Sequence, residues 1–443
     1  MNILLCTVFV AVFLWGLASN SDLFSPAKFF LFSFLIFHLG VLSGRYSYEL
    51  WMLIVLVLLV GAATVLFEAW DPLPRSVHCA LTLRRYCDPR TFLIWIWVLS
   101  LPALAAEGYL LWKVGGVQAY INVIGNRVLE FRGAGWAVAL SATLVTFNLA
   151  YFAVGLTRAR SGWWWSAYGV HLSLALAVGL LSGSRSGFLT IFALQLFCYH
   201  YLKSNVGLTR ALPIAVALVA AALLLGAVRN SVKFEDDTLS VGVGNGVGDQ
   251  ALQYGTFKYG IQPLQILLDA DHVKPAYGLT LVSVVTNLVP RAWWPDKPDT
   301  GGVFFTKQYT GNAWNGSSNL TPTLLGEMVI NFGWAMGVLL YVSVYPTLMY
   351  LLVRYYRRVV VWARAEPGPT AAVEILLYVC VMWALVGLMV AEVTTTVVSL
   401  VTARLLPLLL VKVVLGQRLR PVRQLRSRRA QPLSSGLQPL PHR

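Results

Sequence analysis

Charged residues are scarce in this chain. Of its 443 residues only 12% are Asp, Glu, Lys or Arg, whereas 57% are hydrophobic. A soluble globular protein carries about a quarter charged residues, so most of the surface of this protein must face something other than water. The composition therefore excludes an ordinary soluble enzyme and indicates a membrane protein.

Cysteine and paired metal ligands are scarce as well. None of the five Cys lies within residues 229–322, the longest polar stretch, so no structural disulfide is expected there. His78 and Cys79 lack the paired spacing of a metal site. The glycine-rich run at 242–248 lacks the strand and helix that flank a phosphate-binding loop. We expect neither a metal nor a cofactor.

Long apolar runs are abundant. Runs of about twenty residues can cross the hydrocarbon core of a bilayer as helices. Eleven spans are predicted, near residues 2–18, 27–43, 50–67, 91–113, 135–157, 163–182, 187–202, 211–228, 324–353, 373–392 and 394–416. No basic stretch precedes the first of them, so a retained helix is expected rather than a cleaved signal peptide.

The placement of positive charge predicts how these spans are oriented. The formal net charge is +15, and the tail 417–443 alone holds seven Arg and no acid. Basic residues also gather at 68–90 and 354–364. Because Lys and Arg beside helix ends mark the cytoplasmic side, these segments are expected inside, and no nucleic-acid partner is needed to explain the charge. Counting spans then places the N-terminus and residues 229–322 outside.

The expected fold is an all-α polytopic membrane protein with about eleven transmembrane helices and one large helical extracytoplasmic loop. Apolar residues recur at helical spacing within 257–268 of this loop, and 279–288 is apolar but too short to span. The expected parts are an N-terminal transmembrane bundle (1–228), a large periplasmic loop (229–322), C-terminal transmembrane helices (323–416) and a basic cytoplasmic tail (417–443).

Cations expected at the outer face are the first candidates for function. Arg185 lies in a turn of Ser and Gly between two spans. Free backbone N–H groups there could join it in holding phosphate, although a snorkelling Arg in a plain hairpin would look the same. Arg291 and Lys297 lie in a proline-rich segment and could hold a diphosphate, Arg with two prongs and Lys as a point charge. Arg229 and Lys233 are further diphosphate-binding candidates near the membrane.

Aromatic and acidic residues complete the candidate site. Trp293 and Trp294 offer flat faces for stacking on sugar rings or for anchoring in the membrane interface. Asp296 follows them, and Glu327 lies where the loop re-enters the membrane. Either carboxylate could act as a general base, although an acid at a helix N-terminus also stabilises the helix.

Arg404 lies in the interior of the last predicted span, where a charge is costly. Its partner could be Glu392 or Glu374 in a structural ion pair. It could equally bind a lipid head group, and the sequence leaves both possibilities open.

The order of these features resembles that of the O-antigen and capsule repeat-unit polymerases of the Wzy type. The matching features are Ser-Arg-Ser-Gly at 184–187, Pro-Arg-Ala-Trp-Trp-Pro-Asp-Lys-Pro at 290–298, and Gly-Glu at 326–327 followed by Asn-Phe-Gly at 331–333. The resemblance covers the overall topology and is sharpest between residues 180 and 340. The usual layout of that family has more spans and an N-terminus inside, so the predicted layout departs from it.

The resemblance implies a glycosyltransferase of the bacterial inner membrane that polymerises undecaprenyl-diphosphate-linked oligosaccharide units at the periplasmic face. Such an enzyme would serve the biosynthesis of O-antigen, a part of lipopolysaccharide, or of another surface polysaccharide. An acceptor hydroxyl would attack the anomeric carbon while the lipid diphosphate leaves, so fixed cations are the main requirement. The implied partners are the lipid-linked oligosaccharides, membrane lipids and a chain-length regulator protein.

Three other functions fit parts of the pattern. An O-antigen ligase would share the topology and chemistry but is expected to use a periplasmic His, and His272 is the only one in the loop. A lipid-linked oligosaccharide flippase would carry charged residues along several spans, whereas the polar residues here crowd into one loop. A structural partner of a secretion complex would not require the charged cluster at 291–297.

Overall fold

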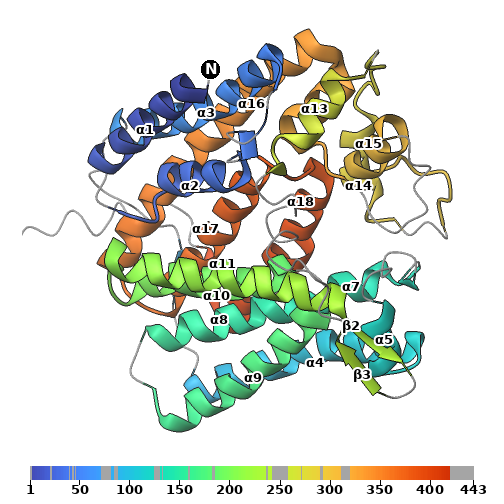
Figure 1. Ribbon diagram of the computed structural model, residues 1–443. Helices are drawn as coiled ribbons and strands as arrows, with labels where there is room; N and C mark the ends of the chain where they lie inside the picture. The colour runs from blue at the N-terminus through green and yellow to red at the C-terminus, as the bar shows by residue number, and fades with distance from the viewer. Residues whose placement is uncertain are drawn as a thin grey trace, which may run out of the picture.

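The computed structural model is built almost entirely of helices (Figure 1). It describes the whole chain except residues 1, 20–21, 39, 42–43, 45, 71–80, 84–87, 124–129, 132, 158–159, 182–184, 236–237, 242–257, 271, 290–292, 311–319 and 420–443.

The helices of the first half are α1 (Asn2–Ser19), α2 (Pro26–His38), α3 (Tyr48–Trp70), α4 (Pro89–Val114), α5 (Val117–Val123), α7 (Gly135–Ser141), α8 (Thr143–Leu156), α9 (Gly162–Leu181), α10 (Arg185–Leu202) and α11 (Leu208–Ser231). Those of the second half are α13 (Gln262–Leu268), α14 (Leu279–Thr286), α15 (Gly301–Tyr309), α16 (Thr323–Ala365), α17 (Pro369–Gly387), α18 (Val393–Ser399), the π-helix η4 (Leu400–Leu405) and α19 (Leu406–Val414). Short strands form two antiparallel pairs, β1 (Leu81–Leu83) with β4 (Gln417–Leu419) and β2 (Val232–Glu235) with β3 (Thr238–Val241).

Within the described residues, seven helices are long and apolar enough to cross a membrane. They are Tyr48–Trp70, Pro89–Val114, Gly135–Leu156, Gly162–Leu181, Thr323–Ala365, Pro369–Gly387 and Val393–Val414. The other four predicted spans coincide with shorter apolar helical stretches, Cys6–Ala18, Pro26–His38, Leu189–Leu202 and Leu208–Leu218. The predicted class, an all-helical polytopic membrane protein, is therefore supported, but the count of eleven full-length spans is not.

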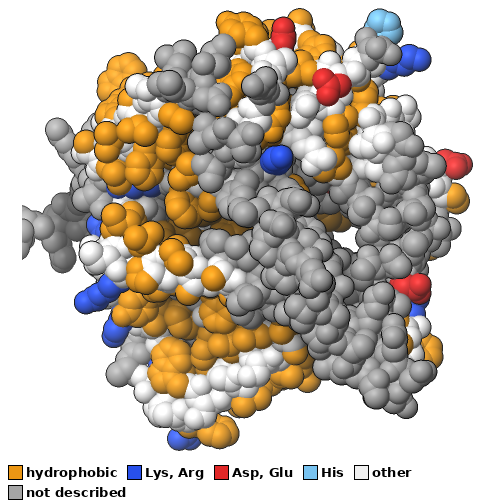
Figure 2. All heavy atoms as spheres, viewed as in Figure 1, with side chains coloured by type: hydrophobic (Ala, Val, Ile, Leu, Met, Phe, Trp, Pro, Cys, Tyr) orange, Lys and Arg blue, Asp and Glu red, His pale blue; other side chains and the backbone are white. Residues whose placement is uncertain are grey.

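Hydrophobic side chains remain exposed along several of these helices. Leu101 in α4, Val170 in α9 and Leu351 in α16 are each more than half exposed. On the face drawn in Figure 2, hydrophobic side chains cover much of the described helical surface, and charged side chains are few. So much exposed apolar surface suits contact with lipid rather than with water.

Helix α4 illustrates how the sequence sets the ends of a span. The side chain of Asp88 accepts a hydrogen bond from the backbone N–H of Arg90 (3.1 Å), and Pro89 takes the first helical position, where no N–H is needed. Gly115 ends the helix in the left-handed conformation (φ 94°) that glycine favours.

The core of the bundle lies around α8 and α17. Twelve of the 14 residues of α8 are buried. Helix α17 packs against α8, α10 and α16, and it occupies the middle of the bundle in Figure 1. Both helices are hydrophobic on nearly all sides, which is the pattern of a helix surrounded by other helices.

Helix α16 is sharply bent. Gly333 has φ 76° and ψ 175°, a conformation that essentially only glycine adopts. A Cβ on Gly337 would lie 2.7 Å from the carbonyl oxygen of Met328, so the residues before and after the bend pack directly against one another. The predicted span 324–353 therefore consists of a short arm, 323–332, and a long helix, 334–365.

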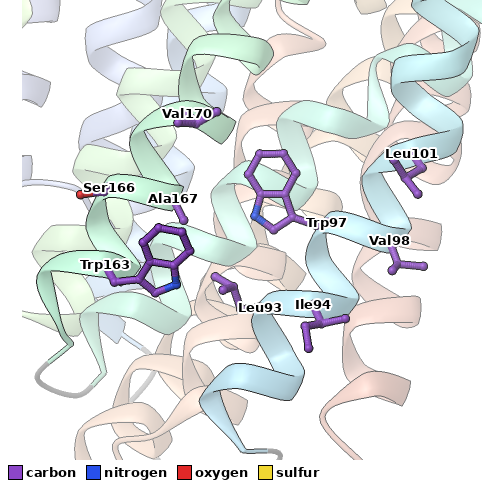
Figure 3. A pocket seen from close by; sticks show the side chains of 9 residues that line it. All are labelled: Leu93, Ile94, Trp97, Val98, Leu101, Trp163, Ser166, Ala167 and Val170. Atoms are coloured by element: carbon purple, nitrogen blue, oxygen red, sulfur yellow. The ribbon is translucent and has the colours of Figure 1, made fainter.

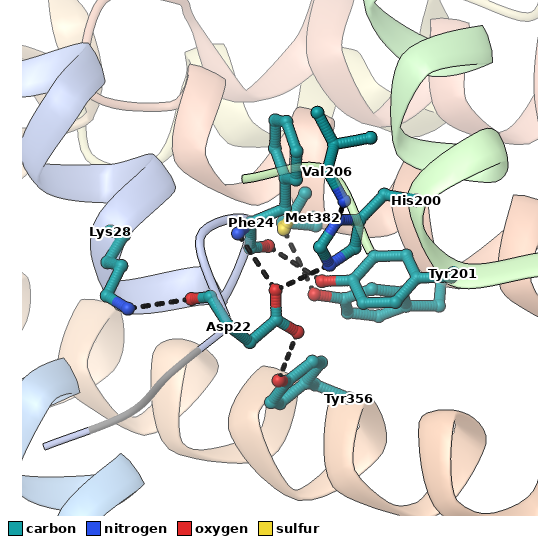
Figure 4. Close-up of polar contacts among 9 residues, drawn as sticks. Asp22, Phe24, Lys28, His200, Tyr201, Val206, Tyr356 and Met382 are labelled. Carbon is teal, nitrogen blue, oxygen red and sulfur yellow. Dashed lines mark hydrogen bonds and ion pairs between the residues drawn. The ribbon is translucent and has the colours of Figure 1, made fainter. Parts of the chain in front are cut away.

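Segments that the predicted alternation assigns to one side of the membrane contact one another, and Figure 4 shows the contacts around Asp22. The carboxylate of Asp22, between α1 and α2, accepts hydrogen bonds from His200 near the end of α10 (2.9 Å) and from Tyr356 in α16 (2.5 Å). Arg357 donates to the carbonyl oxygen of Glu68 near the end of α3. The structure thus groups these segments, and which side of the membrane they occupy stays a prediction.

Candidate functional site

The helices of the long loop (229–322) are fixed to the short arm of α16. The backbone N–H groups of Ala276 and Tyr277 donate to the carbonyl oxygens of Ile330 (2.8 Å) and Asn331 (2.9 Å). These carbonyls lie at the end of the arm, just before Gly333, where a helix leaves acceptors without partners. The loop supplies the missing donors and is thereby held in place.

Glu327 is fully buried in the short arm, and both of its carboxylate oxygens accept hydrogen bonds. Oε1 accepts from the hydroxyl of Thr280 (2.9 Å), and Oε2 accepts from the backbone N–H of Val393 (2.7 Å). Thr280 belongs to α14 and Val393 begins α18. This carboxylate therefore ties a loop helix to the ends of two spans.

The hydrogen bond from Thr280 has a fixed direction. The amide Nδ2 of Asn331, one turn beyond Glu327, donates to Thr280 Oγ1 (2.7 Å) and to the carbonyl oxygen of Glu327 (2.8 Å). Because an amide nitrogen only donates, the hydroxyl hydrogen of Thr280 is directed to the Glu327 carboxylate. Asn331, part of the Asn-Phe-Gly motif, thus supports the acid.

Glu392, the residue directly before Val393, is a second buried carboxylate. Its Oε2 accepts a hydrogen bond from the backbone N–H of Gly302. Burial raises the pKa of the Glu392 carboxyl, and the hydrogen bonds from Gly302, Thr395 and Thr300 oppose this effect. Gly302 lies in the first turn of α15, where free N–H groups favour a negative charge.

Gly301 brings α15 directly against Glu327. A Cβ at Gly301 would lie 2.6 Å from Oε1 of Glu327, closer than real atoms approach, so no larger residue fits here without a shift. The two neighbouring glycines therefore contact different acids. Gly301 leaves space for the side chain of Glu327, and the backbone N–H of Gly302 donates to the carboxylate of Glu392. We call Thr280, Gly301, Gly302, Glu327, Asn331 and Glu392 the docking cluster.

The structure places Lys297, a predicted diphosphate-binding residue, at the C-terminal end of α14. Its Nζ lies 2.7 Å from the carbonyl oxygen of Val289 and 3.5 Å from those of Thr286 and Asn287. A cation at this end of a helix is stabilised by the partial negative charge of the last carbonyls. In this conformation the ammonium is held by the carbonyls of the protein itself.

Trp293, Trp294 and Asp296 face outward. The two tryptophans are 82% and 44% exposed. Asp296 is exposed, and so is His272 in the same loop. Of the two predicted bases, Asp296 is therefore the one open to a substrate in this conformation, whereas Glu327 is enclosed.

Four of the residues predicted to bind diphosphate have side chains that are not in the described part of the structure. Arg291 is not among the described residues. Arg185 begins α10, Arg229 lies in α11 and Lys233 in β2, but their side chains are not described. Their role in diphosphate binding stays a prediction.

An open apolar groove lies between α4 and α9 (Figure 3). It is lined by Leu93, Ile94, Trp97, Val98, Leu101, Trp163, Ser166, Ala167 and Val170. It includes none of the predicted site residues, and its apolar walls suit a lipid chain rather than a polar substrate.

The sequence did not predict that the residues of the docking cluster contact one another. Glu392 carries the same signal as Glu327, an acid directly before an apolar run, and could have been grouped with it. Thr280 and Gly302 carry no such signal, because their partners lie 47 and 90 residues away.

Within the described residues, no three His, Cys, Asp or Glu side chains lie together as metal ligands would. No family model, curated protein or solved structure matches the chain.

Proposed function

We propose that this protein is a polymerase of undecaprenyl-diphosphate-linked oligosaccharide units, acting at the outer face of a bacterial inner membrane. The observation that carries the proposal is the docking of the loop helices on the ends of the spans through Glu327 and Glu392. This arrangement forms a fixed polar platform at one end of an apolar bundle. The exposed segment with Trp293, Trp294 and Asp296 follows α14, and Lys297 at its end contacts the carbonyl of Val289 (2.7 Å), so sugar-stacking faces and a carboxylate are presented next to this platform.

The accessible and the enclosed carboxylate have different roles in this proposal. Asp296 accepts the proton of the acceptor hydroxyl as its oxygen attacks the anomeric carbon. The lipid diphosphate leaves with the electron pair of the broken bond, and Arg185 and Arg291 stabilise its growing negative charge. Glu327, whose oxygens are already engaged, maintains the platform and does not take up the proton.

The polysaccharide pattern of a deletion strain tests the proposed function. Loss of the protein should leave single repeat units at the cell surface, and complementation should restore the ladder of polymer lengths. Polymer stranded on the lipid carrier would instead identify an O-antigen ligase. An unchanged ladder would contradict both assignments.

A lipid-linked oligosaccharide flippase would need a polar path through the bundle, and polar groups do lie in the interior of this one. Nε2 of His171 lies 2.9 Å from Ser100 Oγ, and Nδ1 of His171 lies 3.2 Å from Asn148 Nδ2. Nε2 of Gln195 donates to Asn148 Oδ1 (3.2 Å). Uncharged groups that satisfy one another suit a structural role better than a path for a charged substrate. A flippase defect would leave no repeat units at the surface, whereas a polymerase defect leaves single units there.

A further inference from the structure

Arg404 lies near the middle of the last membrane-spanning helix. This helix runs through α18, η4 and α19, with Glu392 just before its start and Lys412 near its end. At the rise of an α-helix, Arg404 is about 18 Å from the level of Glu392 and about 12 Å from that of Lys412. Position 404 is therefore too deep for an arginine side chain to extend along the helix to water at either end.

Among the residues that the structure describes, the guanidinium has one hydrogen-bond partner, and that partner is neutral. Nη1 of Arg404 donates to Oγ1 of Thr146 on α8 (2.8 Å), and the Thr146 hydroxyl donates its own hydrogen to the carbonyl oxygen of Ala403 (2.5 Å). The second bond turns a lone pair of Thr146 toward Arg404, which orients the guanidinium. The N–H groups on Nε and Nη2 have no hydrogen-bond partner among the described residues.

Both carboxylates that the sequence analysis named as ion-pair partners of Arg404 bind other groups. Glu374 pairs with Lys412 (Oε1 to Nζ, 2.5 Å), and Glu392 accepts from Gly302. Within the described part of the chain, no carboxylate forms an ion pair with Arg404. The expected structural ion pair is thus not formed, and the charge lacks a counter-ion from the protein.

The backbone at Arg404 is irregular. Arg404 lies in the π-helical turn η4, which contacts α7 and α8. π-Turns inside α-helices are frequently found at functional sites.

We propose that Arg404 binds the phosphate groups of a lipid diphosphate within the bundle. Arg404 is partly exposed at this depth, where a cation without a counter-ion is costly. A phosphate would neutralise it through the two parallel hydrogen bonds that a guanidinium forms. Thr146 holds one edge of the group and leaves Nε and Nη2 for the oxyanion. The identity of the lipid as a polyprenyl carrier rests on the proposed function, whereas the recognition of phosphate rests on the geometry alone.

The experiment measures lipid binding by the purified full-length protein in phosphatidylcholine nanodiscs. The probes are a polyprenyl diphosphate and the matching polyprenol without phosphate. The wild type should bind the diphosphate and not the alcohol. Arg404→Gln should weaken binding of the diphosphate by about tenfold to a hundredfold, the worth of a charge-assisted hydrogen bond, and Arg404→Lys should recover part of the loss. The matched control is Arg364→Gln, at an exposed position near the end of α16, which should bind like the wild type.

Equal binding by the wild type and Arg404→Gln would overturn the proposal. If Arg404→Gln does not accumulate, Arg404→Lys and Thr146→Val replace it, and unchanged binding in both would overturn the proposal equally. Competition by phosphatidylglycerol for the Arg404-dependent site would support phosphate recognition with a bilayer lipid as its source. Lack of that competition would support the polyprenyl carrier.

The deletion strain separates this proposal from the proposed function. A normal ladder in that strain would overturn the polymerase and leave Arg404-dependent binding untouched. Single units in that strain, together with normal binding by Arg404→Gln, would overturn only the role of Arg404.

Discussion

The carboxylate of Asp22 and the imidazole of His200 lie 2.9 Å apart (Oδ1 to Nε2), although 178 residues separate them in the chain (Figure 4). The backbone N–H of Val206 donates to Nδ1 of His200 (2.9 Å), so Nδ1 carries no proton and Nε2 is the donor to Asp22. Tyr356 and the backbone of Phe24 donate to the same carboxylate. One acid thus joins the loop after α1 to α10 and α16.

Replacing Asp22 should destabilise the protein in a pH-dependent way. Asp22→Ala should lower the free energy of unfolding by about 2–4 kcal/mol near neutral pH, because it leaves several buried donors without an acceptor. Burial raises the pKa of Asp22, but the hydrogen bonds from His200 and Tyr356 outweigh it and hold the pKa below its ordinary value. The stabilisation is therefore complete above the unfolded-state pKa and is lost as the pH falls through the folded-state pKa.

Unfolding in detergent at a series of pH values measures this effect. The difference between wild type and Asp22→Ala should be constant near neutral pH and shrink below about pH 4. Asp269→Ala, at an exposed position, should change stability little. A difference that persists unchanged into acid would show that the Asp22 charge is not what stabilises this end of the bundle.

Two serines within spans allow a matched test of the interior polar network. Ser100 donates to the carbonyl of Ile96 (2.8 Å) and contacts His171, whereas Ser173 donates to the carbonyl of Gly169 (3.0 Å) and is exposed. Ser100→Ala should lower the free energy of unfolding by about 1 kcal/mol, and Ser173→Ala by a few tenths at most. Equal effects in thermal unfolding would mean that the contact with His171 contributes nothing.

Gly301→Ala should release α15 from the docking cluster. Its Cβ would lie 2.6 Å from Oε1 of Glu327, and relieving such an overlap costs about 1–3 kcal/mol. Limited proteolysis should then cut the long loop faster than in the wild type. Gly108→Ala, in α4 with open space around the new methyl group, should leave cleavage unchanged. If both variants resist proteolysis like the wild type, close packing of Gly301 does not hold the loop.

Replacing Asp296 should lower the rate of turnover, whereas replacing Glu327 should lower the stability of the protein. Asp296→Asn should slow polymerisation of lipid-linked units in a reconstituted assay by about a hundredfold or more, with normal stability. Glu327→Gln should lower stability by about 1–3 kcal/mol, because the single amide oxygen can accept from only one of the two donors, the Thr280 hydroxyl and the Val393 N–H, and the other donor loses its acceptor. Normal turnover by Asp296→Asn would remove Asp296 as the base.

Reporter fusions test the orientation. The Arg-rich tail predicts a cytoplasmic signal for a fusion after Gly416, and the alternation of spans predicts a periplasmic signal near Asn315. A cytoplasmic signal at Asn315 would place the long loop, and the proposed chemistry with it, on the wrong side of the membrane.

The local pattern of apolar residues predicted the positions of several individual helices. The run predicted near 50–67 forms α3 (Tyr48–Trp70), the run near 163–182 forms α9 (Gly162–Leu181), and the apolar stretch 279–288 contains α14 (Leu279–Thr286). Hydropathy did not predict the bend of α16 at Gly333, because that bend depends on one backbone conformation and does not interrupt the apolar run.

Apolar length and the placement of charge are local properties of the chain. For that reason the residues alone sufficed to predict a helical membrane protein and the positions of seven helices long enough to span a membrane. Burial of a side chain depends instead on partners brought from elsewhere. Only the packed structure shows Glu327 enclosed by Thr280 and Val393, and Arg404 donating to the neutral hydroxyl of Thr146. The contacts that decide what an ionisable group can do form between residues far apart in sequence, so no local pattern encodes them.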